Sequence, residues 1–171
     1  MALTVCLLPD QAGERAVRRL WTRLEESGVP TLLSHTHGRH LPHLTLASLT
    51  SYRLDALRPA LTALPAGDHL GTRVDALGIF RRSRVWLAPA VTSTLLERQT
   101  AVVAAAVRSG AAVHPHYRPG DWLPHVTLAP RLTLAQLPLV AARVNEVLPL
   151  TVVWTHTALV HTSTGDVELL G

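Results

Sequence analysis

The chain contains no lysine, and all 16 residues in its lysine-plus-arginine count are arginine. The absence of lysine excludes a lysyl-nucleotide intermediate, a Schiff base and the phosphate-loop lysine of nucleotide-binding motifs. Arginine is instead suited to binding phosphate through two parallel hydrogen bonds. The formal net charge of +4 favours an anionic ligand, although a solvated, arginine-rich surface explains this charge equally well.

Cysteine and long apolar runs are also scarce. The single cysteine, Cys6, cannot form an internal disulfide and lies in an apolar run, where we expect it to pack as a small hydrophobic residue. No run approaches the ~20 apolar residues that a membrane-spanning helix needs, and residues 1–8 lack the charged start of a signal peptide. We therefore expect a cytoplasmic protein with no membrane partner.

The balance of hydrophobic and charged residues indicates a folded chain. Hydrophobic residues make up 47% of the sequence and charged residues only 16%, so the chain can bury a substantial core. Its 171 residues contain no flexible linker that would separate independent domains. We expect a single domain over residues 1–171 and a monomeric protein.

Two seven-residue segments, LPHLTLA and LPHVTLA, lie 82 positions apart (125 − 43) and are nearly identical. Polar and apolar residues alternate in both, so in a β-strand His43 and Thr45 would project from one face. His125 and Thr127 would do the same in the second segment. Each segment therefore offers an imidazole beside a hydroxyl, with the apolar residues anchored in a core.

Periodicity and turn residues predict alternating strands and helices along the whole chain. Helices are expected near residues 11–27, 54–64, 92–108 and 134–148. Strands are expected near residues 3–8, 43–49, 74–80, 85–88, 125–129, 150–160 and 166–170, with a turn at 65–68.

The order of the expected elements is the same in the two halves of the chain. Each half carries a helix, a His-x-Thr strand, a further helix and a strand, which indicates a duplicated unit. We therefore predict an α+β fold with two pseudo-symmetric lobes around a central cleft. Each lobe is expected to be a mainly antiparallel sheet with helices on its outer face.

Two histidines facing one cleft are suited to general acid–base catalysis. With an unperturbed pKa of about 6.5, one imidazole can accept a proton while the other donates one near neutral pH. Cleavage of a phosphodiester needs both steps, because a nucleophile loses a proton as the leaving oxygen gains one. The hydroxyls of Thr45 and Thr127 would hydrogen-bond the phosphoryl oxygens, and this scheme needs no metal or other cofactor.

The segments His43–Leu46 and His125–Leu128 resemble the two signature motifs of the 2H phosphoesterase superfamily, which includes 2′-5′ RNA ligases and RNA 2′,3′-cyclic phosphodiesterases. The likeness extends to residues 77–80 (LGIF) and 84–87 (RVWL), which are similar to a mid-chain segment of bacterial members. The length of the chain and the order of its elements also fit that superfamily.

This resemblance implies a two-lobed fold and a hydrolase that opens the 2′,3′-cyclic phosphate ends of RNA or nucleotides. By this resemblance His43 and His125 would be catalytic, and Thr45 and Thr127 would bind the phosphate. The pseudo-symmetry of the site allows either histidine to be the acid; of the two arrangements we favour His43 as the acid and His125 as the base. No cofactor is implied. The same site working in reverse would join RNA ends through a 2′-5′ linkage without ATP.

The sequence departs from the pattern of these relatives in two places. Relatives of the RNA-ligase type often carry a basic residue directly after the second motif, whereas here Pro130 precedes Arg131. The segment before the first motif, residues 34–40, is unusually rich in histidine. Both departures concern the substrate more than the type of reaction.

Tyr117, Arg118 and Trp122 lie just before the second motif, so we expect them at the border of the cleft. The aromatic rings are candidates to stack on a base and Arg118 to hold a phosphate, as such groups do in single-stranded RNA recognition. For Trp122 the alternative is plain core packing. The arginines of residues 81–84 are most simply explained as exposed charge in a turn.

Two other classes of function stay open at this point. His35, His37, His40 and His43 could form a metal site, because histidine is a common zinc ligand, and the protein would then be a metal-dependent hydrolase. Alternatively, the protein could bind RNA ends or nucleotides without catalysis.

Overall fold

The computed structural model describes residues 3–65, 69–81 and 83–170. Its helices are α1 (Gln11–Glu26), α2 (Leu54–Thr62), α3 (Ser93–Arg108) and α4 (Leu137–Asn145), with the 3₁₀ turns η1 (Pro115–Tyr117) and η2 (Leu134–Gln136). Its strands are β1 (Leu3–Pro9), β2 (Leu44–Ser51), β3 (Leu70–Phe80), β4 (Arg84–Pro89), β5 (Ala112–Val113), β6 (Val126–Ala129), β7 (Leu150–His161) and β8 (Val167–Leu170). No helix in these ranges is long and apolar enough to cross a membrane.

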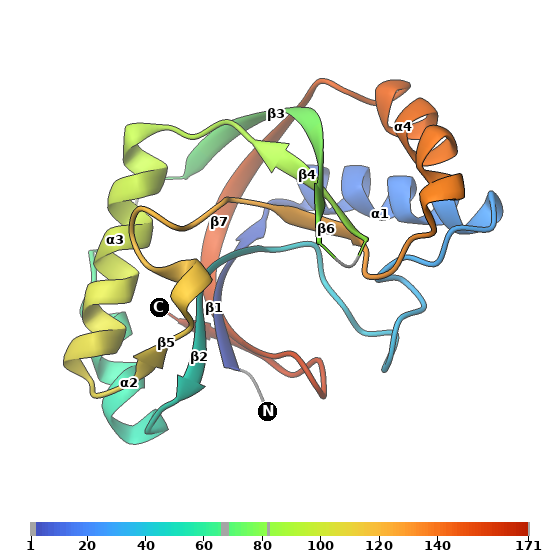
Figure 1. Cartoon of the computed structure of the whole chain (residues 1–171). Coiled ribbons are helices and arrows are strands. Elements are labelled where there is room, and N and C mark those ends of the chain that lie inside the picture. The colour runs from blue at the N-terminus through green and yellow to red at the C-terminus, as the bar shows by residue number, and fades with distance from the viewer. Residues whose placement is uncertain (1–2, 66–68, 82, 171) are drawn as a thin grey trace.

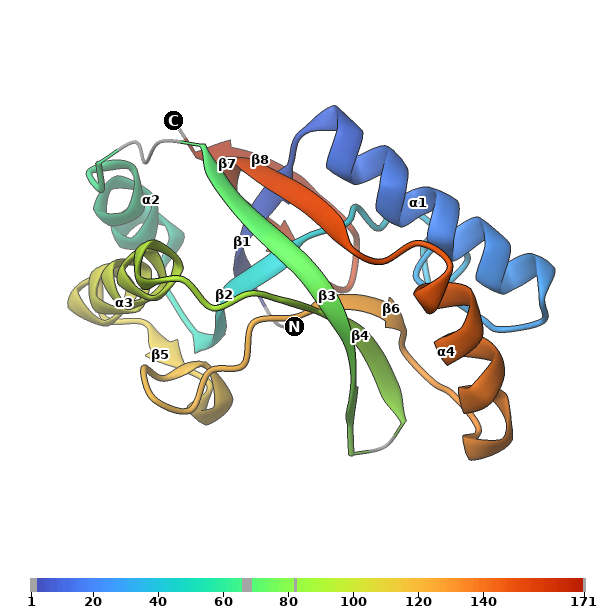
Figure 2. The same cartoon turned by 90° about the horizontal axis from the view of Figure 1, so that it is seen from above.

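The strands form one sheet in the order β5-β2-β1-β7-β3-β4-β6, and β8 also pairs with β7. Every pairing is antiparallel. The long strand β7 pairs with β3 through residues 150–154 and with β1 through residues 154–161. It therefore runs through the middle of the fold and joins the two halves of the sheet, as the view from above shows (Figure 2).

The predicted α+β class and the antiparallel pairing are confirmed, with the difference that the two lobes share one continuous sheet. The reason is the length of β7, which is long enough to pair with a strand of each lobe, β3 through its first residues and β1 through the rest. The helices lie in two pairs on either side of this strand: α2 contacts α3, and α1 contacts α4 (Figures 1 and 2).

The duplication extends to whole elements. α3 begins and ends 82 positions after α1 (93 − 11 and 108 − 26), and β6 begins 82 positions after β2 (126 − 44). The repeats are β1-α1-β2-α2-β3 and β4-α3-β6-α4-β7. They interleave, because α3 of the second repeat contacts β2 of the first, and Trp21 of α1 donates a hydrogen bond to the Thr127 carbonyl of β6 over 3.3 Å.

The first helix illustrates how local sequence fixes an element. The Asp10 side chain accepts a hydrogen bond from the Gly13 amide over 2.8 Å and caps the N-terminus. Gly28 follows the helix with a φ of 80°, a conformation that glycine adopts without strain. An apolar stripe on one side of the helix is buried: Val17, Leu20, Trp21 and Leu24.

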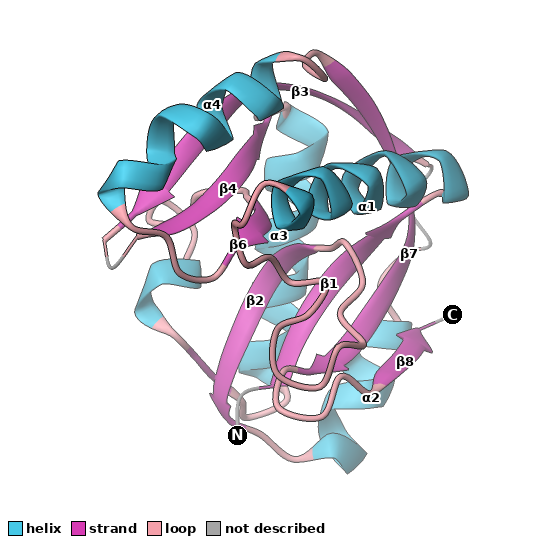
Figure 3. Cartoon of the chain, turned by 90° about the vertical axis from the view of Figure 1, so that its right-hand side faces the viewer, coloured by secondary structure: helices cyan, strands magenta, loops and turns pink. Residues whose placement is uncertain are grey.

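The two faces of the sheet are packed differently. Leu7 of β1 belongs to the main core, whereas its neighbours Cys6 and Leu8 belong to a small separate cluster that also contains Ala158 and Val160 of β7. Since successive residues of a strand point to opposite faces, the small cluster lies on the face opposite the main core. Loops cover part of this second face (Figure 3).

The observed boundaries differ from the predicted ones in a few places. β2 and β6 each begin one residue after the motif histidine, so His43 and His125 stand at the entry of their strands. β5 and η1 lie between the helix expected near 92–108 and the strand expected near 125–129, where no helix or strand was predicted. The expected helix over 134–148 is divided into η2 and α4, because Pro138 near the start of α4 has no amide to donate.

Two predicted features fall outside the described residues. Of the turn expected at 65–68, only Pro65 is described. In the expected basic turn, Arg82 lies outside the described residues, whereas Arg81 and Arg84 are described and exposed.

The close contact between Gly78 of β3 and the ring of Trp86, beside His125, can be tested by substitution. A Cβ atom at this position would overlap the ring of Trp86, its registered partner on β4, so Gly78→Ala must displace that ring. We expect Gly78→Ala to lower the free energy of unfolding by about 1–3 kcal/mol, the usual cost of overpacking. Chemical denaturation measures this change.

The matched control is Gly71→Ala on the same strand, where an added Cβ meets nothing within 4 Å. We expect this variant to keep the stability of the parent protein. Equal effects of the two substitutions would contradict the role assigned to the contact between Gly78 and Trp86.

Candidate active site

The two motif histidines are held in the same way. The Nδ1 atom of His43 lies 2.7 Å from the Leu41 carbonyl oxygen, and that of His125 lies 2.8 Å from the Leu123 carbonyl oxygen. A carbonyl can only accept, so Nδ1 of each neutral imidazole must carry the proton and donate it. The lone pair is therefore on Nε2 in both rings, free to accept a proton from a ligand or from water.

Aromatic rings surround His125. The edge-to-face contact with Phe80 has a centroid distance of 4.8 Å, and the rings of Trp86 and Tyr117 have centroids 6.0 Å and 6.4 Å from that of His125. Burial lowers the pKa of His125 to about 4 despite the opposing hydrogen bond to Leu123, and the charges of His43 and Arg84 act in the same direction as burial. The two motif histidines are thus close enough to interact electrostatically.

Burial also lowers the pKa of His43, against the effect of its hydrogen bond to the Leu41 carbonyl. With both pKa values below the ordinary value, both imidazoles are neutral at pH 7 in the ligand-free protein. An anion bound between them would raise both pKa values and favour a protonated partner.

The motif threonines are held by hydrogen bonds of their side chains or backbone carbonyls. The Thr45 hydroxyl is buried and lies 3.6 Å from the Cys6 sulfur, and it hydrogen-bonds the side chain of Tyr117. Thr127 is half-buried. The backbone carbonyls of both threonines accept a hydrogen bond from an indole, Thr45 from Trp122 over 3.0 Å and Thr127 from Trp21 over 3.3 Å.

The three residues predicted at the border have different placements. Tyr117 lies between His125 and Thr45, as described above, and is half-buried. Arg118 is exposed, and its guanidinium forms no hydrogen bond or ion pair with the part of the chain that the structure describes. Trp122 is only 7% exposed and packs in the main core, which agrees with the alternative of core packing.

Sequence reasoning did not identify Phe80 and Trp86 as site residues. Both belong to the segments that carry the resemblance to bacterial 2H proteins, so the signal was present, but nothing in the pattern indicated a contact with His125. That contact depends on the pairing of β4 with β6, in which Trp86 is registered with Thr127.

The histidine-rich segment forms a stack of rings. The ring centroids of His37 and His40 are 4.1 Å apart, and those of His35 and His40 are 5.9 Å apart. Burial, together with the charges of His37, His43 and His35, lowers the pKa of His40 to about 4. Among residues 3–65, 69–81 and 83–170, no three or more His, Cys, Asp or Glu side chains are arranged to hold a metal ion. The metal-site hypothesis therefore gains no support from these residues.

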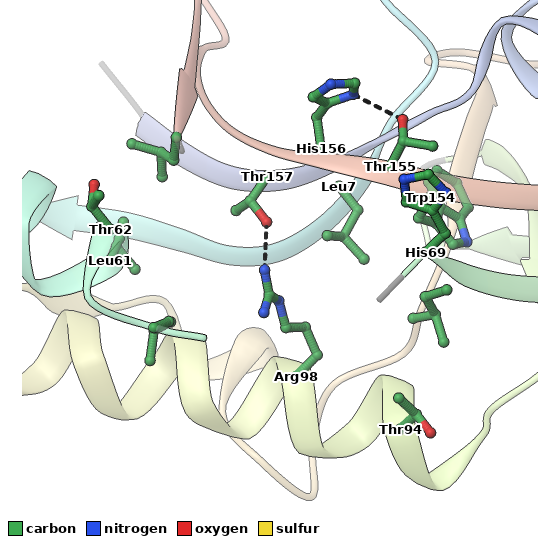
Figure 4. A pocket seen from close by; sticks show the side chains of 13 residues that line it. Leu7, Leu61, Thr62, His69, Thr94, Arg98, Trp154, Thr155, His156 and Thr157 are labelled. Carbon is green, nitrogen blue, oxygen red and sulfur yellow. Dashed lines mark hydrogen bonds between the residues drawn. The ribbon is translucent and has the colours of Figure 1, made fainter. Parts of the chain in front are cut away.

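A cavity of about 290 Å³ lies away from the motif histidines, between α2, α3 and the middle of β7 (Figure 4). Arg98 of α3 points into it and donates hydrogen bonds to Thr157 over 3.0 Å and to the Pro65 carbonyl over 2.6 Å. His43 and His125 do not line this cavity. The predicted central cleft between the lobes stays a prediction.

The sequence profile of the 2′-5′ RNA ligase superfamily matches residues 8–166, almost the whole chain. The chain belongs to this superfamily. The resemblance to 2H phosphoesterases noted in the two His-x-Thr motifs is thereby confirmed. No curated protein sequence matches the chain significantly.

Several solved structures share the fold of the chain. Escherichia coli LigT complexed with NADP⁺ is similar with a TM-score of 0.63 and 18% identity, over 99% of this chain and 94% of that one. A protein described as a phosphoesterase is similar with a TM-score of 0.63 and 18% identity, over 98% and 92%. The MHV ns2 PDE domain is similar with a TM-score of 0.58 and 15% identity, over 99% and 97%. At these identities the likeness establishes the fold.

The lowered pKa of His125 predicts a dependence of stability on pH. In the unfolded chain the imidazole has a pKa of about 6.5, so below that pH the unfolded state binds more protons than the folded state. We expect the free energy of unfolding to decrease as the pH falls from about 6.5 to about 4, by up to about 1.4 kcal/mol per pH unit for this group.

Denaturation at pH 7 and pH 5 tests this expectation in the parent protein and in two variants. His125→Gln should reduce the difference in stability between the two pH values, whereas His69→Gln, which replaces an exposed histidine, should keep it. An undiminished pH dependence in His125→Gln would show that the folded protein does not disfavour the charged form of His125.

Proposed function

We propose that the protein hydrolyses the 2′,3′-cyclic phosphate ends of RNA or of nucleotides by acid–base catalysis with His43 and His125. The observation that carries this proposal is the common tautomer of the two histidines, each with Nδ1 held by a backbone carbonyl and Nε2 unprotonated. The charge of one imidazole affects the pKa of the other. When an anionic substrate binds and one imidazole takes up a proton, the protonated ring can act as the acid and the neutral ring as the base.

In the proposed reaction a water molecule attacks the phosphorus atom. Nε2 of His125 takes a proton from this water as the new P–O bond forms. Nε2–H of His43 gives its proton to the ribose oxygen as the P–O bond to that oxygen breaks, which leaves a phosphate monoester. Of the two, His125 suits the base, because its pKa of about 4 keeps it neutral; His43 then supplies the proton.

The hydroxyl groups at the site provide donors for the phosphate. Thr45 and Thr127 lie two residues after the histidines, and Tyr117 contacts both His125 and Thr45. Arg118, exposed on the preceding loop, is free to reach a phosphate oxygen from outside. Such donors stabilise charge that develops on the oxygens of the phosphate in the transition state.

The structural relatives support a nucleotide ligand. LigT has been solved with NADP⁺, with ATP and with 3′-AMP, and the MHV relative is described as a PDE domain. All of these ligands contain a ribose and phosphate. The superfamily name further suggests the reverse reaction, in which a cyclic phosphate and a 5′-hydroxyl are joined as a 2′-5′ linkage without ATP.

Alanine substitution of either motif histidine tests the mechanism. We expect His43→Ala and His125→Ala each to lower kcat for a 2′,3′-cyclic nucleotide by about 10²–10⁴-fold, the usual contribution of a general acid or base. His69→Ala, remote from the site, is the matched control. Near-native turnover in both site variants would exclude this chemistry.

The same assay with a chelator separates the proposal from its alternatives. Activity that survives the chelator is expected here, whereas loss of activity that zinc restores would favour a metal-dependent hydrolase. Binding of RNA ends without turnover by the parent protein would favour a non-catalytic module. Separation of the 2′- and 3′-phosphate products identifies which ribose oxygen leaves.

We expect the hydrogen bond from the Trp122 indole to the Thr45 carbonyl to position Thr45. Trp122→Phe removes the indole donor of the Thr45 carbonyl, and Trp154→Phe removes a comparable buried bond to Thr72 over 2.8 Å, far from the histidines. Each variant should lose about 1–3 kcal/mol of unfolding free energy. Only Trp122→Phe should also lower kcat, and equal kcat values in both variants would remove Trp122 from the positioning of the site.

A further inference from the structure

Arg84 and Arg131 stand at one end of the β4–β6 pair. Arg84 is the first residue of β4, and Arg131 follows β6 by two residues. The antiparallel register pairs Val85 with Ala129, so the two arginines come to the same end of these strands. Both are exposed, and neither forms an ion pair with a carboxylate among the described residues.

Arg84 lies on the face of the sheet that carries the motif histidines. It lies two residues before Trp86 on β4, and its registered partner on β3 is Phe80. The rings of both aromatic residues contact His125, with Phe80 at a centroid distance of 4.8 Å. Because residues two apart on a strand share a face, Arg84 is next to the ring cluster around His125.

The histidine-rich loop reaches the same place from the other side. The Leu32 amide donates to the Leu128 carbonyl of β6 over 3.1 Å, which ties the loop to that strand. One carboxylate oxygen of Glu25 accepts hydrogen bonds from Thr31 and Ser34, both from their amides and from their hydroxyls. His35 follows directly, and its pKa is lowered by burial and by the charges of Arg131 and Arg84.

We propose that Arg84, Arg131 and His35 form a second phosphate-binding subsite beside His125, so that the preferred substrate carries a further phosphate besides the cyclic one. This inference rests on the proposed function of the site. Guanidinium groups bind phosphate oxygens through paired hydrogen bonds, and unneutralised arginines at a site edge are available for them. The further phosphate is either the 5′-phosphate of a nucleotide or the next phosphodiester of an RNA chain.

Equilibrium binding measures the subsite without the need for turnover. The probes are adenosine 3′-phosphate, adenosine 3′,5′-bisphosphate and a 3′-phosphorylated adenosine dinucleotide, each titrated at the same ionic strength. We expect the parent protein to bind a probe with the added phosphate at least about tenfold more tightly than adenosine 3′-phosphate. Tighter binding of the bisphosphate identifies a terminal phosphate, and tighter binding of the dinucleotide alone identifies the RNA backbone.

The variants Arg84→Gln and Arg131→Gln should reduce this preference about tenfold or more, mainly through weaker binding of the probes with the added phosphate. The matched control is Arg108→Gln in the last turn of α3, which removes the same charge at an exposed position away from β4 and β6. Circular dichroism checks that the variants are folded, as expected for exposed substitutions.

Equal affinity of the parent protein for all three probes would overturn the subsite, as would a preference that survives in both arginine variants. An equal loss in Arg108→Gln would also overturn it, since it would show a general effect of charge. Failure of the proposed function is a separate result, seen as the absence of turnover of every cyclic phosphate while the binding preference persists.

Discussion

The continuous pairing of β7 with β1 and β3 is the constraint on which the rest of the structure depends. This one strand is hydrogen-bonded to a strand of each lobe, so the position of one motif strand is fixed relative to the other. In a flat sheet β2 and β6, five strand intervals apart, would be separated by roughly 24 Å. Tyr117 nevertheless hydrogen-bonds the Thr45 side chain and has its ring centroid 6.4 Å from that of His125, so the sheet must curl strongly to bring the two motif strands together.

Much of this arrangement could be predicted from the sequence, because it is repeated there. The offset between the two His-x-Thr segments is also the offset between α1 and α3, so one local similarity predicted the order of whole elements. Alternation within the segments correctly predicted that Thr45 and its neighbours divide between two faces. The α+β class followed from the same pattern.

Other features were out of reach because they depend on which strands pair. Nothing in the local sequence of residues 150–161 shows that the two ends of this strand pair with different lobes. The contact of Phe80 with His125 arises only after β3, β4 and β6 are placed in register. The burial of Trp122 could not be predicted for a similar reason: an aromatic residue before a strand looks the same in sequence whether its ring packs inward or faces a ligand.

The buried position of Cys6 has a practical consequence. Its side chain is fully buried between Thr4 and Thr45, and burial raises the pKa of its thiol to about 11, so only about 10⁻⁴ of it is thiolate at neutral pH. A cysteine introduced on the surface would therefore be the one readily alkylated group. Spectroscopic labels could then be attached at a single chosen position, on the histidine-rich loop or the β3–β4 hairpin, without first removing the native thiol.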